Sequence, residues 1–279
     1  MFYKVLFAFL GIAMFSSGLF AQADICIGKG DTVYSRVLQE ERAYWIHLPE
    51  SYADSIQKSY PVIYLLDGDL LFHALVALQR SYSRGRQPFM PECIIVGILN
   101  TDRTRDLTPS KSAYRRDGKR YGGDREVGGG SEMFTACLID ELRPKINRTY
   151  RTNDINIIAG HSFGGLFVLN TLIHHSQSFN MYIALDPSFW WDNGKLQKEA
   201  DKLFETKQFN HVKLYLGIAA KIQPDANSIH PNIADSFLNS TLPKAIKNGL
   251  KADYKIFADE SHGTIPIPGM SDALKTIFQ

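Results

Sequence analysis

Residues 156–166 read NIIAGHSFGGL, and the prediction of the fold begins from this stretch. An apolar run, INIIAG, ends at Gly160, and a second apolar run, FGGLFVLNTLI, begins directly after Ser162. Together they match the G-x-S-x-G pattern, in which a strand passes through a sharp turn into a helix and leaves a serine exposed above a sheet. Gly160 and Gly164 provide room where side chains would clash in such a turn. The stretch predicts a nucleophile at Ser162; a serine that only caps a helix is the alternative.

A serine hydroxyl needs a base, and in enzymes with this turn the chain order is serine, acid, histidine. His262, in FADESHGTI, follows the last apolar run and is therefore the preferred base. His230 lies in a late loop and is the rival. His161 is the neighbour of Ser162, but its side chain is expected to leave the turn on another side.

The acid that orients the base is less clearly marked in the sequence. It is expected after the next-to-last apolar run, KLYLGIA, and Asp225 is the first carboxylate there. Asp186, at the end of MYIALD, and Asp235 are the alternatives. A Ser–His dyad without an orienting carboxylate is also left open.

Two backbone N–H groups are expected to form an oxyanion hole. Phe163 follows the nucleophile at the start of a predicted helix, so its N–H would point at a developing oxyanion. The second donor should come from the loop after VIYLLDGD, where the N–H of Asp69 is the best candidate. The carboxylates of Asp67 and Asp69 are expected to be structural, because negative charge would oppose an oxyanion unless it is hydrogen-bonded elsewhere.

Beyond this stretch, strand-like and helix-like runs alternate along the chain. An antiparallel hairpin is predicted at 31–38 and 42–48, joined through 39–41. Continuous apolar runs follow and indicate parallel strands covered on both faces: PVIYLLD, CIIVGILN, INIIAGHS, MYIALDP, KLYLGIA and DYKIFAD. Helices are predicted at 131–146, with Ser131 as N-cap, and at 163–175, 193–205, 234–248 and 271–278. The alternation predicts one doubly wound α/β domain over residues 24–279.

Residues 101–130 break the alternation, being rich in charge and glycine without an apolar period. A stretch that long without a structural signal is usually functional or disordered, and we expect an active-site loop here. It leaves the carboxyl end of the CIIVGILN strand, which is the edge of an open α/β sheet where ligands bind.

Composition sets further bounds. The chain has 279 residues, a net charge of +2 and 22% charged residues, a balance that does not favour nucleic-acid binding. Residues 1–23 combine an early lysine, an apolar core and a terminal AQA, and predict a signal peptide, with a secreted or periplasmic mature protein and no membrane span after cleavage. A membrane anchor is the less favoured alternative. No Cys/His cluster has zinc spacing, and we expect neither a metal nor another cofactor.

The quoted segments, with ELRPKINRTYRT, PSFWWD and ESHGTIP, resemble the esterase family of α/β-hydrolases that includes esterase D, the enterobactin esterases and the mycolyltransferases. The resemblance runs from about Asp31 onward and is greatest to the secreted, siderophore-esterase branch. It implies an α/β-hydrolase fold with Ser162 as nucleophile, His262 as base and the Asp69 and Phe163 N–H groups as oxyanion hole. Because the family often has a carboxylate soon after the next-to-last strand, LGIAAKIQPD departs from its pattern. A Ser–His dyad has been proposed for the siderophore-esterase branch, so the resemblance does not require a third residue.

The resemblance also suggests a substrate-binding region. Trp190 and Trp191 are expected to line an acyl or aryl pocket or to pack in the core. Arg103 is expected to bind an acidic or phenolic substrate or to brace the long loop. The predicted function is ester hydrolysis through an acyl-enzyme on a small-molecule or glycan-linked ester: a siderophore lactone, an aryl or feruloyl ester, or an acetyl ester. An acyltransferase and a non-catalytic binding protein are the alternatives.

Overall fold

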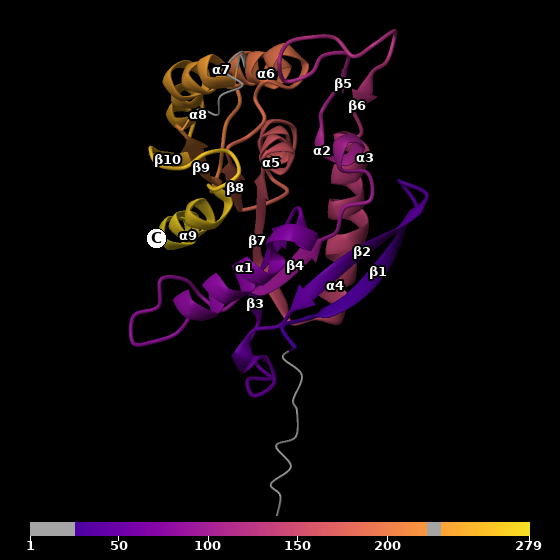
Figure 1. The fold of residues 1–279 in the computed structure, drawn as a ribbon. Coiled ribbons are helices and arrows are strands. Elements are labelled where there is room, and N and C mark those ends of the chain that lie inside the picture. The colour runs from indigo at the N-terminus through magenta and orange to yellow at the C-terminus, as the bar shows by residue number, and fades with distance from the viewer. Residues whose placement is uncertain (1–25, 222–229) are drawn as a thin grey trace, which may run out of the picture.

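The fold is described by a computed structural model that covers residues 26–221 and 230–279 (Figure 1). Its centre is a twisted eight-stranded sheet with the order β1-β2-β4-β3-β7-β8-β9-β10. The strands are β1 (Lys29–Ser35), β2 (Glu40–His47), β3 (Tyr60–Leu65), β4 (Ile94–Ile98), β7 (Thr152–His161), β8 (Met181–Leu185), β9 (Lys213–Ala219) and β10 (Lys251–Phe257). From β4 to β10 all neighbours are parallel, whereas β2 is antiparallel to both β1 and β4. The predicted α/β class and the leading hairpin are confirmed.

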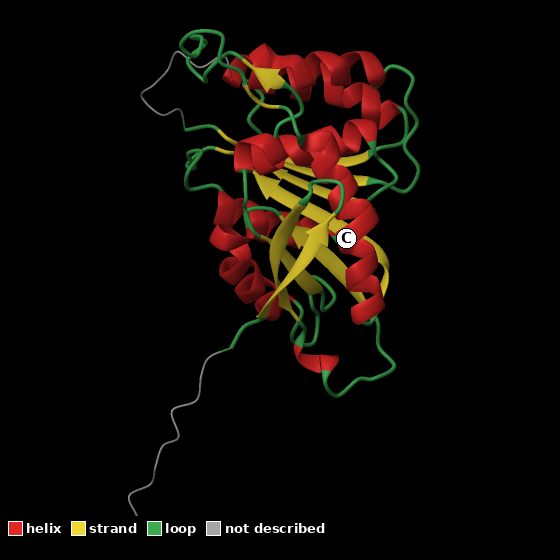
Figure 2. Ribbon diagram, turned by 90° about the vertical axis from the view of Figure 1, so that its right-hand side faces the viewer, coloured by secondary structure: helices red, strands yellow, loops and turns green. Residues whose placement is uncertain are grey.

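Helices cover both faces of the sheet, as Figure 2 shows. The helices are α1 (Gly68–Tyr82), α2 (Arg103–Leu107), α3 (Ser131–Ala136), α4 (Arg143–Thr149), α5 (Phe163–His174), α6 (Lys195–Leu203), α7 (His230–Ser236), α8 (Leu242–Lys247) and α9 (Pro266–Ile277). One apolar core lies between the sheet and α1 and α9, and a larger one lies under α3–α6 and α8. Because β3 and β4 are buried on both faces, their sequences are continuously apolar rather than alternating.

The turn of the leading hairpin lies earlier than predicted. The structure ends β1 at Ser35 and already places Glu40 and Glu41 in β2, so the turn is formed by residues 36–39 rather than 39–41. The Glu141 carboxylate holds this turn, because it accepts hydrogen bonds from the Ser35 hydroxyl (2.5 Å) and the Arg36 N–H (2.8 Å). Such a contact from a distant helical segment cannot be seen in local sequence.

Helix boundaries differ from prediction at several points. Helix α1 was not among the predicted helices, and α9 begins at Pro266 rather than at residue 271. The predicted helices at 131–146 and 234–248 are each interrupted by a π-helical segment, Cys137–Leu142 and Phe237–Thr241. Ser131 is not an N-cap: it is the first helical residue, and its buried hydroxyl accepts a hydrogen bond from the Asn170 amide.

The segment 101–130 is more ordered than its composition predicts. It contains α2 and a short hairpin of β5 (Lys111–Ser112) and β6 (Val127–Gly128). Buried Asp106 accepts hydrogen bonds from Arg42 (2.6 Å) and Arg105 (2.7 Å), which attach α2 to the side of β2. The order of this segment therefore depends on ion pairs, including one between distant parts of the chain, and not on the apolar periodicity from which helices and strands are predicted.

The last strand is the other departure. DYKIFAD reads as a strand covered on both faces, but β10 is the edge strand of the sheet and most of its residues are exposed. The covering helix α9 lies mainly over β8 and β9.

Candidate active site

The turn at Ser162 has the strained geometry that the sequence predicts. Strand β7 ends at His161 and α5 begins at Phe163, so Ser162 alone makes the turn, with φ 60° and ψ −117°. Positive φ is costly for a residue with a side chain, and such strain is found mainly at functional sites. The backbone of Ser162 fixes the turn, since its N–H donates to the Leu185 carbonyl (3.0 Å). A Cβ at Gly160 would lie 2.5 Å from the Gly164 backbone, which explains why this position requires glycine.

Three side chains from three separate segments form one hydrogen-bonded chain. The Oγ of Ser162 lies 3.0 Å from Nε2 of His262, and Nδ1 of His262 lies 2.6 Å from Oδ2 of Asp186. Asp186 is buried, whereas the side chain of His262 is about one quarter exposed (26%). The arrangement can carry a proton from Ser162 to the imidazole while the carboxylate holds the ring in the required tautomer.

Strand order explains why Asp186 reaches the base. Strand β8 lies next to β7 in the sheet, so the residue that follows β8 lies beside the turn that follows β7. Asp186 makes its own sharp turn there, with φ 40°. Its N–H donates to the Gly217 carbonyl (2.7 Å), and its Oδ1 accepts from the Ala219 N–H (3.1 Å). The carboxylate is therefore fixed by β9 before it contacts His262.

The other two candidate acids do not occupy this place in the described structure. Asp225, the first choice from the sequence, lies outside the described residues. Asp235 is exposed on α7, and its carboxylate makes no hydrogen bond with His262. Among the described residues, Asp186 is the carboxylate that the geometry joins to His262.

The loop that carries His262 runs from the end of β10 to the start of α9. The Ser261 N–H donates to the Thr264 hydroxyl (2.9 Å), and the Thr264 N–H donates to the Ser261 carbonyl (3.1 Å). These bonds close a tight turn with His262 inside it. The rival His230 is the first residue of α7, and the structure describes its backbone but not its side chain.

His161 packs against the base rather than leaving the site. Its ring centroid lies 4.6 Å from that of His262, with an angle of 39° between the planes. Burial and the nearby His262 lower the pKa of His161 to about 4, so its ring is neutral at pH 7. A neutral ring leaves His262 free to accept a proton without facing a second positive charge.

Both predicted oxyanion donors lie at helix starts. Phe163 is the first residue of α5, and Asp69 lies in the first turn of α1, so their N–H groups lack helical partners. The carboxylates of Asp67 and Asp69 are hydrogen-bonded to other side chains, as the sequence led us to expect. Asn100 donates to Asp67 and to Asp69, in both cases at 2.9 Å.

Arg103 braces the turn. Its guanidinium binds the two Asp67 oxygens at 2.6 and 2.9 Å, and it approaches the His161 carbonyl at 3.5 Å. The guanidinium also lies over the Phe163 ring, 5.3 Å from its centroid. The bracing alternative therefore has direct contacts, while one third of the side chain (34%) stays exposed.

We expect Arg103→Lys to weaken the site as a whole, because lysine cannot form the two-pronged contact with Asp67. The expected result is a fall in kcat/KM of about tenfold for neutral and anionic esters alike, since loss of one charged hydrogen bond costs about 1.5 kcal/mol. Steady-state kinetics on a matched pair of esters measure this. A loss confined to the anionic ester would instead indicate direct substrate binding.

The two tryptophans differ in their surroundings. Trp191 is buried, and its indole N–H donates to the Ser110 carbonyl (2.9 Å), which ties the segment 101–130 to the site. Core packing, the alternative left open by the sequence, thus describes Trp191. Trp190 is half-buried, and its ring lies 5.7 Å from that of Phe163. Of the two, Trp190 is the one that can contact a substrate.

Ser188 is a site residue that the sequence-based prediction missed. Its buried hydroxyl lies 3.2 Å from the Oγ of Ser162, and its N–H donates to the Ser162 carbonyl (3.1 Å). Ser188 follows Asp186 by two residues in the same turn. The signal that could have identified it is the pairing of β8 with β7, which places this whole turn against the nucleophile.

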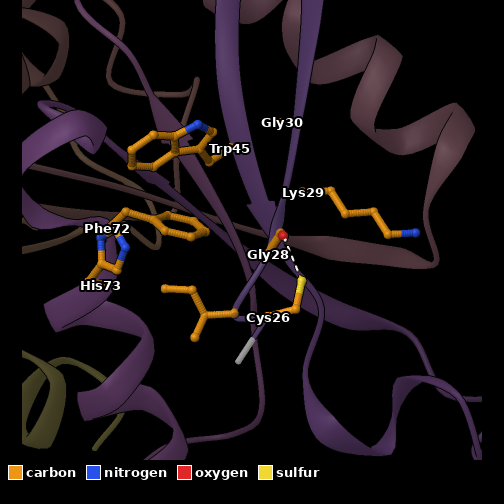
Figure 3. Close-up of a pocket in the computed structure, with 8 residues that line it drawn as sticks. Cys26, Gly28, Lys29, Gly30, Trp45, Phe72 and His73 are labelled. Carbon is orange, nitrogen blue, oxygen red and sulfur yellow. Dashed lines mark hydrogen bonds between the residues drawn. The ribbon is translucent and has the colours of Figure 1, made fainter. Parts of the chain in front are cut away.

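A separate pocket of about 460 Å³ lies at the start of β1, between Trp45 and the first turns of α1 (Figure 3). Cys26, Lys29, Phe72 and His73 are among its lining residues, and none of the predicted site residues is. No group of three or more His, Cys, Asp or Glu side chains in the described part of the chain has a metal-binding arrangement.

A serine on a strained strand-to-helix turn, joined to an imidazole and a buried carboxylate, defines a serine hydrolase of the α/β-hydrolase fold. Residues 35–261 match the family described as “Putative esterase”. The chain belongs to this esterase family and is an ester-hydrolysing enzyme of the serine hydrolase type.

Relatives agree with this assignment. The chain is 29% identical over 252 residues to the ferri-bacillibactin esterase BesA of Bacillus subtilis, a match that covers 85% of each chain. It is 26% identical to the apo-salmochelin esterase of Escherichia coli, over 78% of this chain and 69% of that one. Among solved structures, an IroE-like serine hydrolase from Shewanella oneidensis is 32% identical, with a TM-score of 0.84 over 90% of this chain and 80% of the other.

Proposed function

We propose that this enzyme is exported and hydrolyses siderophore esters through an acyl-enzyme on Ser162. The observation that carries the proposal is the unbroken hydrogen-bonded chain from Ser162 through His262 to Asp186. A hydroxyl in this setting is a nucleophile, because the base that takes its proton is already within hydrogen-bond distance.

The reaction follows from the geometry in two halves. Ser162 Oγ attacks the ester carbonyl carbon while His262 Nε2 takes the hydroxyl proton, and Asp186 stabilises the resulting imidazolium. The N–H groups of Phe163 and Asp69 would donate to the oxyanion. His262 then gives its proton to the departing alkoxide. In the second half, water attacks the acyl group, His262 again carries the proton, and Ser162 is released.

The substrate class is supported by the relatives and by the side chains around the nucleophile. The named relatives act on bacillibactin and salmochelin, according to their descriptions. In this chain the half-buried ring of Phe163, the residue after the nucleophile, lies 5.7 Å from the half-buried ring of Trp190. Flat rings beside the nucleophile suit an aromatic substrate, which a plain acetyl ester is not.

Export is proposed from the first 23 residues, whose pattern is that of a signal peptide. In the described part of the chain no helix is long and apolar enough to cross a membrane. The exported protein should begin near Asp24, and mass spectrometry of protein recovered outside the cytoplasm checks this. An intact N-terminus there would contradict cleavage.

Covalent labelling combined with a substrate panel tests the proposal. A fluorophosphonate should form an adduct on the peptide that contains Ser162, and a tris-catecholate trilactone should slow the labelling. The same trilactone should be hydrolysed with a higher kcat/KM than a feruloyl or acetyl-sugar ester. An adduct on another residue would remove the nucleophile assignment. Turnover of the small esters with an intact trilactone would remove only the siderophore assignment.

A further inference from the structure

The outer edge of the sheet at β10 is unusual in being both apolar and exposed. Tyr254 and Ile256 are each 51% exposed on one face of the strand. In the described ranges, 26–221 and 230–279, β10 pairs only with β9, and Figure 1 shows it at the rim of the sheet. An edge strand presents unpaired N–H and C=O groups, which can accept another strand.

The backbone groups that face outward can be identified from the contacts with β9. The Lys251 N–H donates to the Val212 carbonyl (3.1 Å), and the Phe257 carbonyl accepts from the Ala220 N–H (3.0 Å). Because backbone direction alternates along a strand, the odd-numbered residues of β10 bond inward to β9. The groups that face outward, and that pair with no other strand of the described residues, therefore belong to Ala252, Tyr254 and Ile256.

A second copy of β10 in antiparallel orientation must place outward residues opposite outward residues. Three registers satisfy this rule over the centre of the strand, with the two-fold axis at residue 253, 254 or 255. An axis at 253 would set Asp253 against the second copy's Asp253, and an axis at 255 would set Lys255 against the second copy's Lys255. Like charges directly opposite are destabilising, so these two registers are disfavoured.

The axis at Tyr254 has the opposite property. It sets Asp253 against Lys255 of the second copy, and the two-fold axis repeats this pair on the other side. Both side chains are exposed on the same face of the strand. On the other face, Ile256 meets the second copy's Ala252 beside a central pair of Tyr254 rings. The order Lys-Ala-Asp-Tyr-Lys-Ile-Phe is thus self-complementary in backbone, charge and apolar surface at one register only.

We propose that two copies of this chain associate through antiparallel β10 strands, with the two-fold axis at Tyr254, into a continuous sheet. Closed two-fold contacts use the same patch on both partners, as here. Lys255 already binds Asp272 of its own α9 (2.6 Å) and in the dimer lies between that carboxylate and Asp253 of the second copy. The nucleophile follows β7, the acid follows β8 and the base lies in the loop after β10, all within one copy, so each copy keeps its own site.

Reciprocal charge reversal tests the register. Asp253→Lys should give a monomer, because the introduced lysine would face Lys255 of the second copy, and Lys255→Asp should do the same through two aspartates. An equimolar mixture of the two variants should form a heterodimer, because both charge pairs then join opposite signs again. Lys251→Asp is the matched control, since its partner in this register is Phe257, and it should remain a dimer.

Light scattering after size exclusion, at about 1 to 100 µM protein, provides the measurement over a range where a modest interface dissociates. Tyr254→Pro should also be monomeric and keep esterase activity, because proline removes an outward N–H that β9 does not use. A wild-type protein that stays monomeric throughout this range overturns the proposal. A dimer that survives both charge reversals and the proline, or a mixture that stays monomeric, overturns it as well.

Discussion

Ser162→Ala is expected to lower kcat/KM for p-nitrophenyl acetate by about 10⁴- to 10⁶-fold. The physical reason is that the Oγ of Ser162 is the only atom of this side chain that can form the acyl-enzyme, and Nε2 of His262 lies 3.0 Å from it. The oxyanion donors and the substrate contacts persist in the variant, so a weak residual rate above the uncatalysed reaction is expected. Burst kinetics on the wild type measure the formation of the acyl-enzyme. Steady-state rates on the wild type and the variant measure the fall in kcat/KM.

Ser188→Ala is the matched control for this prediction. It removes the Ser188 hydroxyl, which lies 3.2 Å from the Ser162 hydroxyl in the same site. Both variants lose one hydroxyl oxygen. We expect a loss of no more than about tenfold, because Ser188 can only donate to or accept from Ser162 and one uncharged hydrogen bond is worth about 1 kcal/mol. Circular dichroism of both variants should match the wild type. If Ser162→Ala kept most of its turnover and Ser188→Ala lost it, the nucleophile would be Ser188.

Some features of this site follow from local sequence and were therefore predictable. The turn at Ser162 is specified by a buried strand, glycines that permit close approach and a helix that begins at once, all within residues 156–166. The base is fixed by chain order, because a residue just past the last parallel strand lies at the edge of the sheet where the turn is. These are properties of short segments and of strand direction.

The acid depended on information that the sequence does not carry locally. The expectation that it follows the next-to-last strand favoured Asp225, but the carboxylate beside His262 follows β8 instead. Two strands that are neighbours in space end side by side, so either can supply the acid, and chain order alone does not decide between them. Ser188 was overlooked for the same reason. Once β8 is known to pair with β7, Asp186, so far an alternative, becomes the preferred acid, and Ser188 becomes a candidate site residue.

In two other segments the prediction was wrong about which parts of the chain pack against the segment. DYKIFAD is a strand, as predicted, but its place at the rim of the sheet is a property of the whole topology. The order of residues 101–130 depends on buried Asp106 and its two arginine partners, which come from β2 and α2. Apolar periodicity indicates which residues are buried against a core, but it does not indicate ion pairs between distant segments.

Asp186→Asn is expected to lower kcat by about 10⁴-fold while the fold and the substrate contacts persist. The Ala219 N–H donates to Oδ1 of Asp186, so in the variant the amide oxygen should stay on Ala219 and the amide nitrogen should face His262. An amide N–H donates to Nδ1, which moves the imidazole proton to Nε2, the nitrogen that must accept the proton of Ser162. This change keeps the shape of the side chain, but it reverses the tautomer of the base and removes the negative charge that stabilises the imidazolium.

Asp225→Asn and Asp235→Asn, measured beside it, separate the three carboxylates that the sequence left open. Both should retain turnover within about threefold, because His262 already has the Asp186 carboxylate as its partner. A 10⁴-fold loss in Asp225→Asn with an active Asp186→Asn would make Asp225 the acid. Near-normal rates in all three variants would mean that Ser162 and His262 work as a dyad, with Asp186 only holding the ring in place. Because the hydrogen bond at 2.6 Å joins Asp186 to the nitrogen that sets the tautomer, we expect the triad result.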